Sequence, residues 1–337
     1  MESVVVGVVG AGSWGTTLAR IAGDNGHPVL FWARNEALCR AINETRVNAR
    51  YLPGAELPST VEATSDLERV CRSCQLIFLA VPSYGLRAVA TDMGRYLDGG
   101  HLVVHATKGI EQETFKRMSE VLREETCVRR IGVLAGPNLA RELAARQPAG
   151  SVVASRYQEV VARSHAALHN RYFRIYGSND VVGVEVGGAF KNIVALAAGV
   201  IDGLGLGDNS KALLLTRGLS EMVRLGVDMG AKVPTFGGMA GIGDLMATCA
   251  SPLSRNHQVG ERLAKGQGLP DIQAEMTMVA EGPRTTLAVH AYARRRGLNL
   301  PIVDAVHRIL YEGAHVPQVI EALMALETGN ECVGLSV

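Results

Sequence analysis

Lys191 is the residue of this chain whose type and surroundings most clearly indicate chemistry. It is the only charged residue in the apolar helical segment 186–201, which reads VGGAFKNIVALAAGVI. A helix that is apolar on every face is normally buried, and a buried ammonium group is costly unless it is paired or deprotonated. Beside a carbonyl, a protonated lysine can stabilise and protonate the alkoxide that hydride transfer leaves. The alternative is a lysine that extends from a core helix to solvent.

A glycine motif near the amino terminus predicts a source for that hydride. Gly10, Gly12 and Gly15 form G-x-G-x-x-G, written GAGSWG, directly after a strand-like apolar run. Such glycines permit a tight turn and let backbone N–H groups approach a pyrophosphate, toward which the next helix points its amino terminus. Strand, motif, helix and second strand follow in order. We therefore predict a dinucleotide site; an ordinary glycine-rich turn is the alternative.

Arg34 lies at the end of the second predicted strand, where the cofactor is commonly selected, and Glu36 follows two residues later. An acidic residue there binds the ribose 2′-hydroxyl of NAD, whereas an arginine accommodates the 2′-phosphate of NADP. We expect NADP to be accepted or preferred. A solvated surface arginine is the competing interpretation.

Four further segments carry polar groups that could meet at the cofactor. Lys108 follows one predicted strand and Gly136–Asn138 follows another, and ligands of open α/β sheets bind beyond such strand ends. A surface lysine explains Lys108 equally well. Asp244 follows a glycine-rich stretch, where it could orient Lys191 or simply cap a helix. Ser254–Asn256 opens a helix and could hold a phosphate, with helix capping by Ser254 as the alternative.

The elements that position these residues fall into two halves. The first half alternates short β-rich runs with helical stretches, which predicts a doubly wound α/β domain with a parallel sheet. The expected strands are 4–9, 29–33, 76–81, 102–106, 131–134, 151–154 and 173–176. The second half is helical, with expected helices at 184–204, 210–230, 255–265, 283–296, 301–311 and 317–326. A turn-rich seam at 177–183 predicts domains at 1–180 and 181–337.

Composition limits the class of protein. The chain has 337 residues and a formal charge of +1, so no global field attracts nucleic acid or a membrane surface. The amino terminus has no basic region before its first apolar run, which favours a core strand over a signal peptide. The longest apolar run carries Lys191 and is too short for a membrane span. We expect a cytoplasmic protein that binds any anion through local groups.

Cysteine and histidine spacing does not indicate a metal. Cys71 and Cys74 form a single C-x-x-C without a second pair, so reduced thiols near a buried strand are favoured over redox work or half a metal site. His165 and His169 stand four residues apart without a third ligand, and we interpret them as surface histidines.

Several strings together resemble the bacterial NAD(P)-dependent glycerol-3-phosphate dehydrogenases. The similarity covers nearly the whole chain, and the lysine helix with GIGDL and SRN is more specific than the glycine motif. The strings are GAGSWGTTLA at 10–19, FWAR at 31–34, ATKGIE at 106–111, AGPNLA at 135–140, EVGGAFKNIVALAAG at 185–199, GIGDLMATC at 241–249, SRN at 254–256 and VAEG at 279–282.

The resemblance implies a Rossmann-like domain followed by an all-α domain of the 6-phosphogluconate dehydrogenase type, often in a homodimer. It also implies interconversion of dihydroxyacetone phosphate and sn-glycerol 3-phosphate with NAD(P) and no metal, supplying phospholipid synthesis. Lys191 would donate and accept the proton, with Lys108 and Asp244 as its catalytic partners. Substrate contacts would come from Lys108, Gly136, Asn138, Lys191, Asn192, Asp244, Thr248, Ser254, Arg255 and Asn256. Cofactor contacts would come from Gly10, Gly12, Ser13, Trp14, Gly15, Arg34, Lys108, Ala140, Arg255, Val279 and Glu281.

Asn138 departs from the pattern, because the family usually has Ser or Thr there. The nearest rival function is a 2-hydroxy- or 3-hydroxyacid dehydrogenase, since an arginine-bearing anion site could hold a carboxylate. A catalytically silent NAD(P)-sensing module is a rival of another class, because fold does not imply function.

Overall fold

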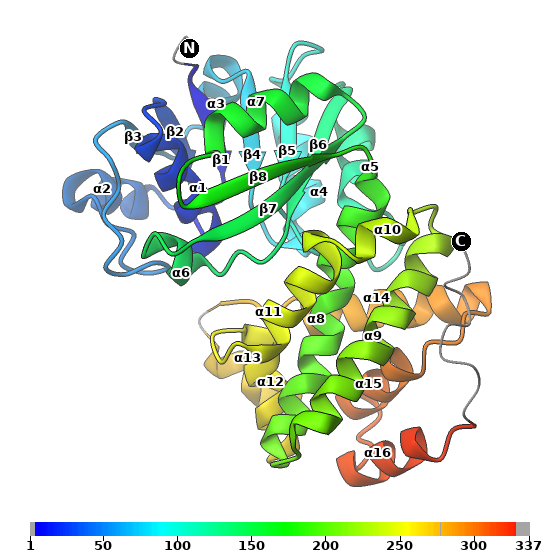
Figure 1. Ribbon diagram of the computed structural model, residues 1–337. Helices are drawn as coiled ribbons and strands as arrows, with labels where there is room; N and C mark the ends of the chain where they lie inside the picture. Colours follow the sequence, from blue (N-terminus) through cyan, green and yellow to red (C-terminus); the bar gives the residue numbers. More distant parts are fainter. Residues whose placement is uncertain (1–3, 277, 328–337) are drawn as a thin grey trace. The chain divides into compact units, whose positions relative to one another are not determined.

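The computed structural model describes residues 4–276 and 278–327, and the chain divides into two compact units (Figure 1). The first unit comprises Met1–Thr107 and Met118–Val181, and the second comprises Lys108–Arg117 and Val182–Val337. The sequence placed a boundary between residues 180 and 181. The division of the chain lies one residue later, and a ten-residue excursion, Lys108–Arg117, groups with the second unit.

The first unit is built on one eight-stranded sheet in the order β3-β2-β1-β4-β5-β6-β7-β8. Neighbouring strands are parallel except for β6 and β7. The strands are β1 (Val6–Val9), β2 (Val29–Trp32), β3 (Val61–Thr64), β4 (Leu76–Leu79), β5 (Leu102–His105), β6 (Arg130–Ala135), β7 (Ala149–Ser155) and β8 (Phe173–Ser178).

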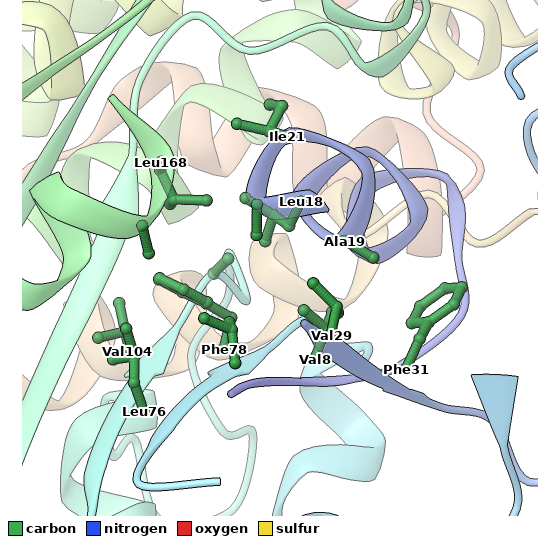
Figure 2. Close-up of a cluster of buried hydrophobic side chains, with 14 of the residues drawn as sticks. Val8, Leu18, Ala19, Ile21, Val29, Phe31, Leu76, Phe78, Val104 and Leu168 are labelled. Atoms are coloured by element: carbon green, nitrogen blue, oxygen red, sulfur yellow. The ribbon is translucent and has the colours of Figure 1, made fainter. Parts of the chain in front are cut away.

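Both faces of the central strands are buried, which explains their continuous apolar runs. Successive residues of a strand point to opposite faces, and here each face has its own apolar core. On one face, strand side chains pack with those of α1 (Ser13–Asp24) and α7 (Gln158–Leu168), and on the other with α3 (Leu67–Ser73), α4 (Ser83–Gly94) and α5 (Met118–Glu125). Figure 2 shows part of the first core, including Val8, Leu18, Ile21, Phe78, Val104 and Leu168.

Two details of the sheet differ from expectation. The strand β3 was not predicted, because VEAT alternates buried and partly exposed residues and has no continuous apolar run. The strand β7 is antiparallel to β6, with Ala135 opposite Val152, so the sheet is mixed where a parallel one was expected. The link between β6 and β7 contains only the five-residue helix α6 (Ala140–Ala144). An antiparallel return needs no crossover helix over the sheet.

The second unit is helical. Its helices are α8 (Val181–Gly203), α9 (Asp208–Asp228), α10 (Val233–Phe236), α11 (Asp244–Ala250), α12 (Arg255–Ala264), α13 (Leu269–Glu275), α14 (Gly282–Arg296), α15 (Pro301–Tyr311) and α16 (Val316–Met324), with one π-helical segment, η1 (Met239–Gly243). The six predicted helices lie at these places, and their prolines occupy first turns as expected. The helices α10 and α13 and the segment η1 were not predicted.

The helix α8 forms the centre of the second unit. It contributes the largest group of residues to that unit's apolar core, including Phe190, Ile193 and Val194. Of the described helices, α8 alone is long and apolar enough to cross a membrane, but 89% of its apolar window is buried inside the protein. A core helix of a globular unit has this same composition.

Candidate active site

Lys191 is buried in α8, and its ammonium group is held by two partners from α11. Its side chain is 9% exposed, and its Nζ donates to Oδ1 of Asp244 at 2.6 Å and to Oγ1 of Thr248 at 2.7 Å. Asp244 and Thr248 lie one helical turn apart, so both face α8. Lys191 therefore does not extend to solvent, and its charge is compensated inside the unit.

Close packing of α8 against η1 brings Asp244 to the lysine. A Cβ atom on Gly187 would lie 2.3 Å from the carbonyl oxygen of Ala240, so a side chain there would separate the two elements. Asp244 is the first residue of α11, and Gly243 occupies the cap position without a side-chain hydrogen bond. The capping role considered for Asp244 is thus wrong. Its carboxylate serves lysines instead of backbone N–H groups.

Lys108 reaches the same carboxylate from the excursion. Its Nζ donates to Oδ2 of Asp244 at 2.7 Å, and its side chain is 14% exposed. Burial lowers the pKa of Lys108 below its ordinary value, more than Asp244 raises it, and the charge of Lys191 lowers it as well. Burial by itself raises the pKa of Asp244, but the two ammonium groups outweigh burial and hold that pKa below its ordinary value. The surface alternative for Lys108 is wrong.

This triad of Lys108, Lys191 and Asp244 has one excess positive charge when both lysines are protonated. An ammonium group has three N–H donors, and Lys191 directs two of them at Asp244 and Thr248. One donor is left for a ligand oxygen. A buried, preoriented donor in a cationic environment suits an oxygen atom that gains negative charge during a reaction.

A second polar network lies beside the triad. The amide of Asn256 donates through Nδ2 to Oδ1 of Asn192 at 2.9 Å and accepts the backbone N–H of Gly282 at 2.8 Å. Asn256 and Asn192 are both buried. A Cβ atom on Gly282 would lie 2.7 Å from Oδ1 of Asn256, so glycine is required there. Asn256 thus links α8, α12 and α14, with one N–H left for a ligand.

The start of α12 carries the predicted anion-binding residues. Ser254 caps the helix by accepting the N–H of His257 at 3.3 Å, which leaves its own O–H as a donor. Arg255 is exposed and donates from Nη1 to the carbonyl of Val279 at 2.6 Å. Its guanidinium keeps further N–H groups for an anion. Glu281 precedes α14 and is half-buried. Ser254–Asn256, Val279 and Glu281 therefore belong to the second unit together with the triad.

The glycine loop of the first unit fits the phosphates of a dinucleotide. Gly10 has φ 113°, a left-handed value that favours glycine, and a Cβ on Gly15 would lie 1.8 Å from the oxygen of Gly10. A Cβ on Gly12 would meet nothing within 4 Å. The helix α1 then begins at Ser13 without a side-chain cap and without an acidic residue in its first turn. Its N–H groups are suited to an anion.

The other predicted cofactor residues of the first unit are spread around this loop. Ser13 donates to the carbonyl of Tyr51 at 2.6 Å, and the ring of Trp14 packs edge-on against Phe173. Ala140 accepts from Thr17 of α1 at 3.4 Å. Arg34 follows β2 and is exposed, with no hydrogen bond or ion pair to the described residues. Its position at the strand end matches the prediction, and its guanidinium is accessible to a ligand.

Gly136 and Asn138 follow β6. Gly136 has φ 146°, and a Cβ there would lie 2.9 Å from Cα of Ser151 on β7. Asn138 is half-buried, and its Nδ2 donates to Oγ of Ser151 at 3.4 Å. The structure therefore groups these two residues with the sheet of the first unit.

The thiols and the spaced histidines form no metal site among the described residues. Cys71 and Cys74 are buried free thiols, and burial raises the pKa of each to about 12, which disfavours the reactive thiolate. The rings of His165 and His169 stack at 4.1 Å, with His165 exposed. Cys332 lies outside the described residues.

Sequence reasoning missed a buried ion pair and a histidine–carboxylate contact in the second unit. Arg117 pairs with Glu185 at 2.5 Å, and Nε2 of His257 lies 2.6 Å from Oδ2 of Asp202. One of the strings quoted above begins at Glu185, so a signal existed: an acidic residue near the start of a long apolar helix. Asp202 at the other end of α8 gives the same signal.

The comparison with protein families matches both halves of the chain. The family model described as "NAD-dependent glycerol-3-phosphate dehydrogenase N-terminus" matches residues 5–161, and that described as "NAD-dependent glycerol-3-phosphate dehydrogenase C-terminus" matches residues 180–321.

Individual proteins are similar over nearly their whole length. A protein of Streptomyces coelicolor named glycerol-3-phosphate dehydrogenase (NAD(P)+) is 47% identical over 326 residues, which cover 96% of this chain and 97% of that protein. A protein of Bacillus thuringiensis with the same name is 46% identical over 94% of each chain. A crystal structure of glycerol-3-phosphate dehydrogenase from Coxiella burnetii is 35% identical, with a TM-score of 0.92 and coverage of 96% of this chain and 99% of that one.

Proposed function

The chain belongs to the NAD-dependent glycerol-3-phosphate dehydrogenase family, and we therefore propose that Lys191 is the proton donor and acceptor of its reaction. It is an oxidoreductase with glycerol-3-phosphate dehydrogenase activity that uses a nicotinamide cofactor. The reaction proposed in detail is the interconversion of dihydroxyacetone phosphate and sn-glycerol 3-phosphate. The observation that carries this proposal is the buried ammonium of Lys191 between Asp244 and Thr248.

Lys191 has the geometry for both directions of proton transfer. Its remaining N–H can donate to the carbonyl oxygen of the ketone and stabilise the charge that grows there. Asp244 fixes the direction of the ammonium, and Lys108 on the other carboxylate oxygen keeps Asp244 ionised. In the reverse direction, the neutral amine would accept the proton of the substrate hydroxyl. Thr248 holds the amine through its hydroxyl, which can donate or accept as the charge changes.

The phosphate of the substrate is assigned to Arg255 with Ser254 and Asn256. Arg255 offers a planar cationic fork and Ser254 a hydroxyl at a helix amino terminus, which together suit a phosphate. Asn256 has one free N–H and otherwise positions Asn192, which we assign with Lys108 and Thr248 to the substrate oxygens. Gly136 and Asn138 stay proposed substrate contacts. Asn138 is longer than the usual Ser or Thr.

The cofactor is assigned to the glycine loop, with its pyrophosphate at the start of α1. Bound there, the nicotinamide would donate or accept the hydride. We propose that Gly10, Gly12, Ser13, Trp14, Gly15, Arg34 and Ala140 hold it from the first unit, and Lys108, Arg255, Val279 and Glu281 from the second. Residues 1–180 and 181–337 are accordingly proposed as the cofactor and substrate domains, with Lys108 as a contribution of the first segment.

Activity with a panel of ketones tests the proposed substrate. The purified protein should oxidise NADPH or NADH with dihydroxyacetone phosphate and leave short 2-keto and 3-keto acids unreduced. Preference for a keto acid would support the hydroxyacid dehydrogenase alternative. No turnover with any ketone, together with tight NADPH binding, would support a sensing module.

Arg34 tests the proposed acceptance of NADP. Because the exposed guanidinium can pair with a 2′-phosphate, the KM for NADPH should rise about tenfold in Arg34→Ala, which is about 1.4 kcal/mol. The KM for NADH should change little. Equal losses for both cofactors would contradict a role for Arg34 in reading the 2′-phosphate.

We also propose, on the family resemblance, a cytoplasmic homodimer that supplies phospholipid synthesis. Light scattering after gel filtration would measure the mass of the assembly, for which a value near twice 35.8 kDa is expected.

A further inference from the structure

The excursion Lys108–Arg117 is held on the second unit by a buried ion pair at its far end. Nη1 of Arg117 lies 2.5 Å from Oε2 of Glu185, and their side chains are 12% and 3% exposed. Glu185 belongs to α8, six residues before Lys191. The excursion therefore contacts the same helix that carries the proposed proton donor.

The backbone links Arg117 directly to the neighbourhood of Lys108. Arg117 pairs with Ile110 as an antiparallel bridge, and Ile110 is buried in the core of the second unit. The turn between them is closed by a bond from the N–H of Glu111 to the carbonyl of Lys116 at 3.0 Å. Phe115 packs its ring against Tyr292 of α14 at 5.8 Å. Lys108 thus stands two residues before one arm of this bridged turn, called the hairpin below, and Arg117 anchors its other arm.

A buried ion pair contributes little net stability compared with apolar residues of similar size, because both charges must lose their hydration. The ion pair affects the position of the hairpin more than it affects the stability of the fold. The guanidinium fork accepts few orientations of a carboxylate, so the pair fixes where the hairpin lies along α8. A ten-residue excursion without such an anchor would retain conformational freedom, because ordering its residues costs entropy that a fixed contact must offset.

We propose that Arg117 and Glu185 are positioning residues that set the location of Lys108 against Asp244. The inference rests on the role proposed above for Lys108. Neither residue needs to touch substrate or cofactor for this effect. Loss of the pair would let the hairpin shift on α8, and the Lys108–Asp244 contact would lengthen. A displacement of about 1 Å at a reacting centre can cost roughly 100-fold in rate.

The test is a double-mutant cycle on kcat/KM for dihydroxyacetone phosphate. Glu185→Gln and the charge-free double variant Arg117→Met/Glu185→Met should each lower kcat/KM about 10- to 100-fold. In a Lys108→Ala background the same changes should lower it no further, because the residue through which they act is absent. Arg117→Lys should restore part of the activity. Glu113→Gln, an exposed acid on the same hairpin, serves as the control and should match wild type.

A second measurement follows Lys108 without activity. Acetylation of Lys108 by acetic anhydride, quantified by mass spectrometry of the folded protein, should be several-fold faster in the double variant than in wild type. Thermal unfolding shows which variants fold. The charge-free double variant leaves no unpaired charge buried, so its loss of activity cannot be attributed to that destabilising effect.

The outcomes separate the inference from the proposed function. Unchanged kcat/KM and acetylation in the variants would overturn the inference, and so would losses that multiply with that of Lys108→Ala. Full activity of Lys108→Ala with faster acetylation in the double variant would keep the positioning of Lys108 and remove this lysine from the proposed function.

Discussion

The glycine loop of the first unit and the lysine triad of the second unit offer a charged ligand opposite kinds of binding group. The loop offers backbone N–H groups and works by the absence of side chains: Gly12 has open space where a Cβ would stand. The triad uses two lysine side chains on one buried carboxylate, with N–O distances of 2.6 and 2.7 Å. The loop therefore depends on local backbone shape, and the triad depends on tertiary packing that joins an excursion, α8 and α11.

The contrast extends to the cores of the two units. Among the described residues, the buried lysine and both buried glutamates, Lys191, Glu185 and Glu221, lie in the second unit. The first unit buries hydroxyl, amide and imidazole groups instead, apart from Asp180 near its end. A buried charge is costly and persists only where a partner or a function compensates it. Among the described residues, the second unit therefore holds most of the buried charged side chains.

Replacing Lys191, the proposed proton donor, should give the largest effect. Lys191→Met should lower kcat by about 10²- to 10⁴-fold, the usual contribution of a general acid. NADPH binding, measured by fluorescence, should be unchanged, because the glycine loop lies in the other unit. The exposed Lys265→Met is the control. Unchanged turnover in Lys191→Met would show that the lysine takes no part in the mechanism. The comparison between the glycine loop and the lysine triad would then have no catalytic meaning.

Glu221 allows a test of whether ionising a buried carboxyl group in the second unit lowers the free energy of unfolding. Its carboxylate accepts the N–H groups of Ile302 at 2.7 Å and Val303 at 3.3 Å, yet burial raises its pKa from 4.5 to about 7. The folded state then holds this proton up to a higher pH than the unfolded state. Stability should therefore fall as pH rises from about 4.5 to about 7, by on the order of 3 kcal/mol at about 1.4 kcal/mol per pH unit.

Urea unfolding of wild type and Glu221→Gln at pH 5 and pH 8 measures this effect. Wild type should lose stability relative to the glutamine variant between the two pH values. The exposed Glu321→Gln should follow wild type at both. Parallel curves for wild type and Glu221→Gln would show that this carboxyl ionises as it does in the unfolded chain.

Alanine at two glycines of the loop should give smaller and separable effects. Gly12→Ala should weaken NADPH binding roughly tenfold, or about 1.4 kcal/mol, with an unchanged melting temperature, because its Cβ enters the open space proposed for the ligand. Gly15→Ala should also destabilise the fold, by about 1–3 kcal/mol, because its Cβ meets the oxygen of Gly10.

Gly99→Ala, with nothing within 4 Å of its Cβ, is the matched control and should bind NADPH as wild type does. Equal affinity of Gly12→Ala and wild type would contradict the phosphate role of the loop.

The sequence predicted what depends on local pattern. Continuous apolar runs indicated the central strands, and prolines indicated the starts of α14, α15 and α16. The strand β3 was not predicted because it lies at the edge of the sheet, where alternate residues are exposed. The antiparallel direction of β7 was not predicted because apolar composition does not encode strand direction.

The same division holds for the candidate site. Lys191 is conspicuous because a charge in an apolar helix violates the local pattern. Its pairing with Asp244 spans 53 residues of sequence and needs Gly187 to let η1 approach α8. Periodicity does not report such contacts, so Asp244 was equally compatible with a cap. Arg117 was missed for the same reason: a hairpin arginine is ordinary until its carboxylate partner is known.

The excursion has a consequence for any attempt to divide the protein into fragments. The chain passes from one unit to the other after residues 107, 117 and 181, so the second unit is discontinuous in sequence. A recombinant piece beginning at 182 would lack Ile110, leaving a hole in its apolar interior, and Asp244 would have one cation in place of two. Such a truncated product would therefore be a defective version of the helical unit, and independent expression of the two halves would not reconstitute the site in either one.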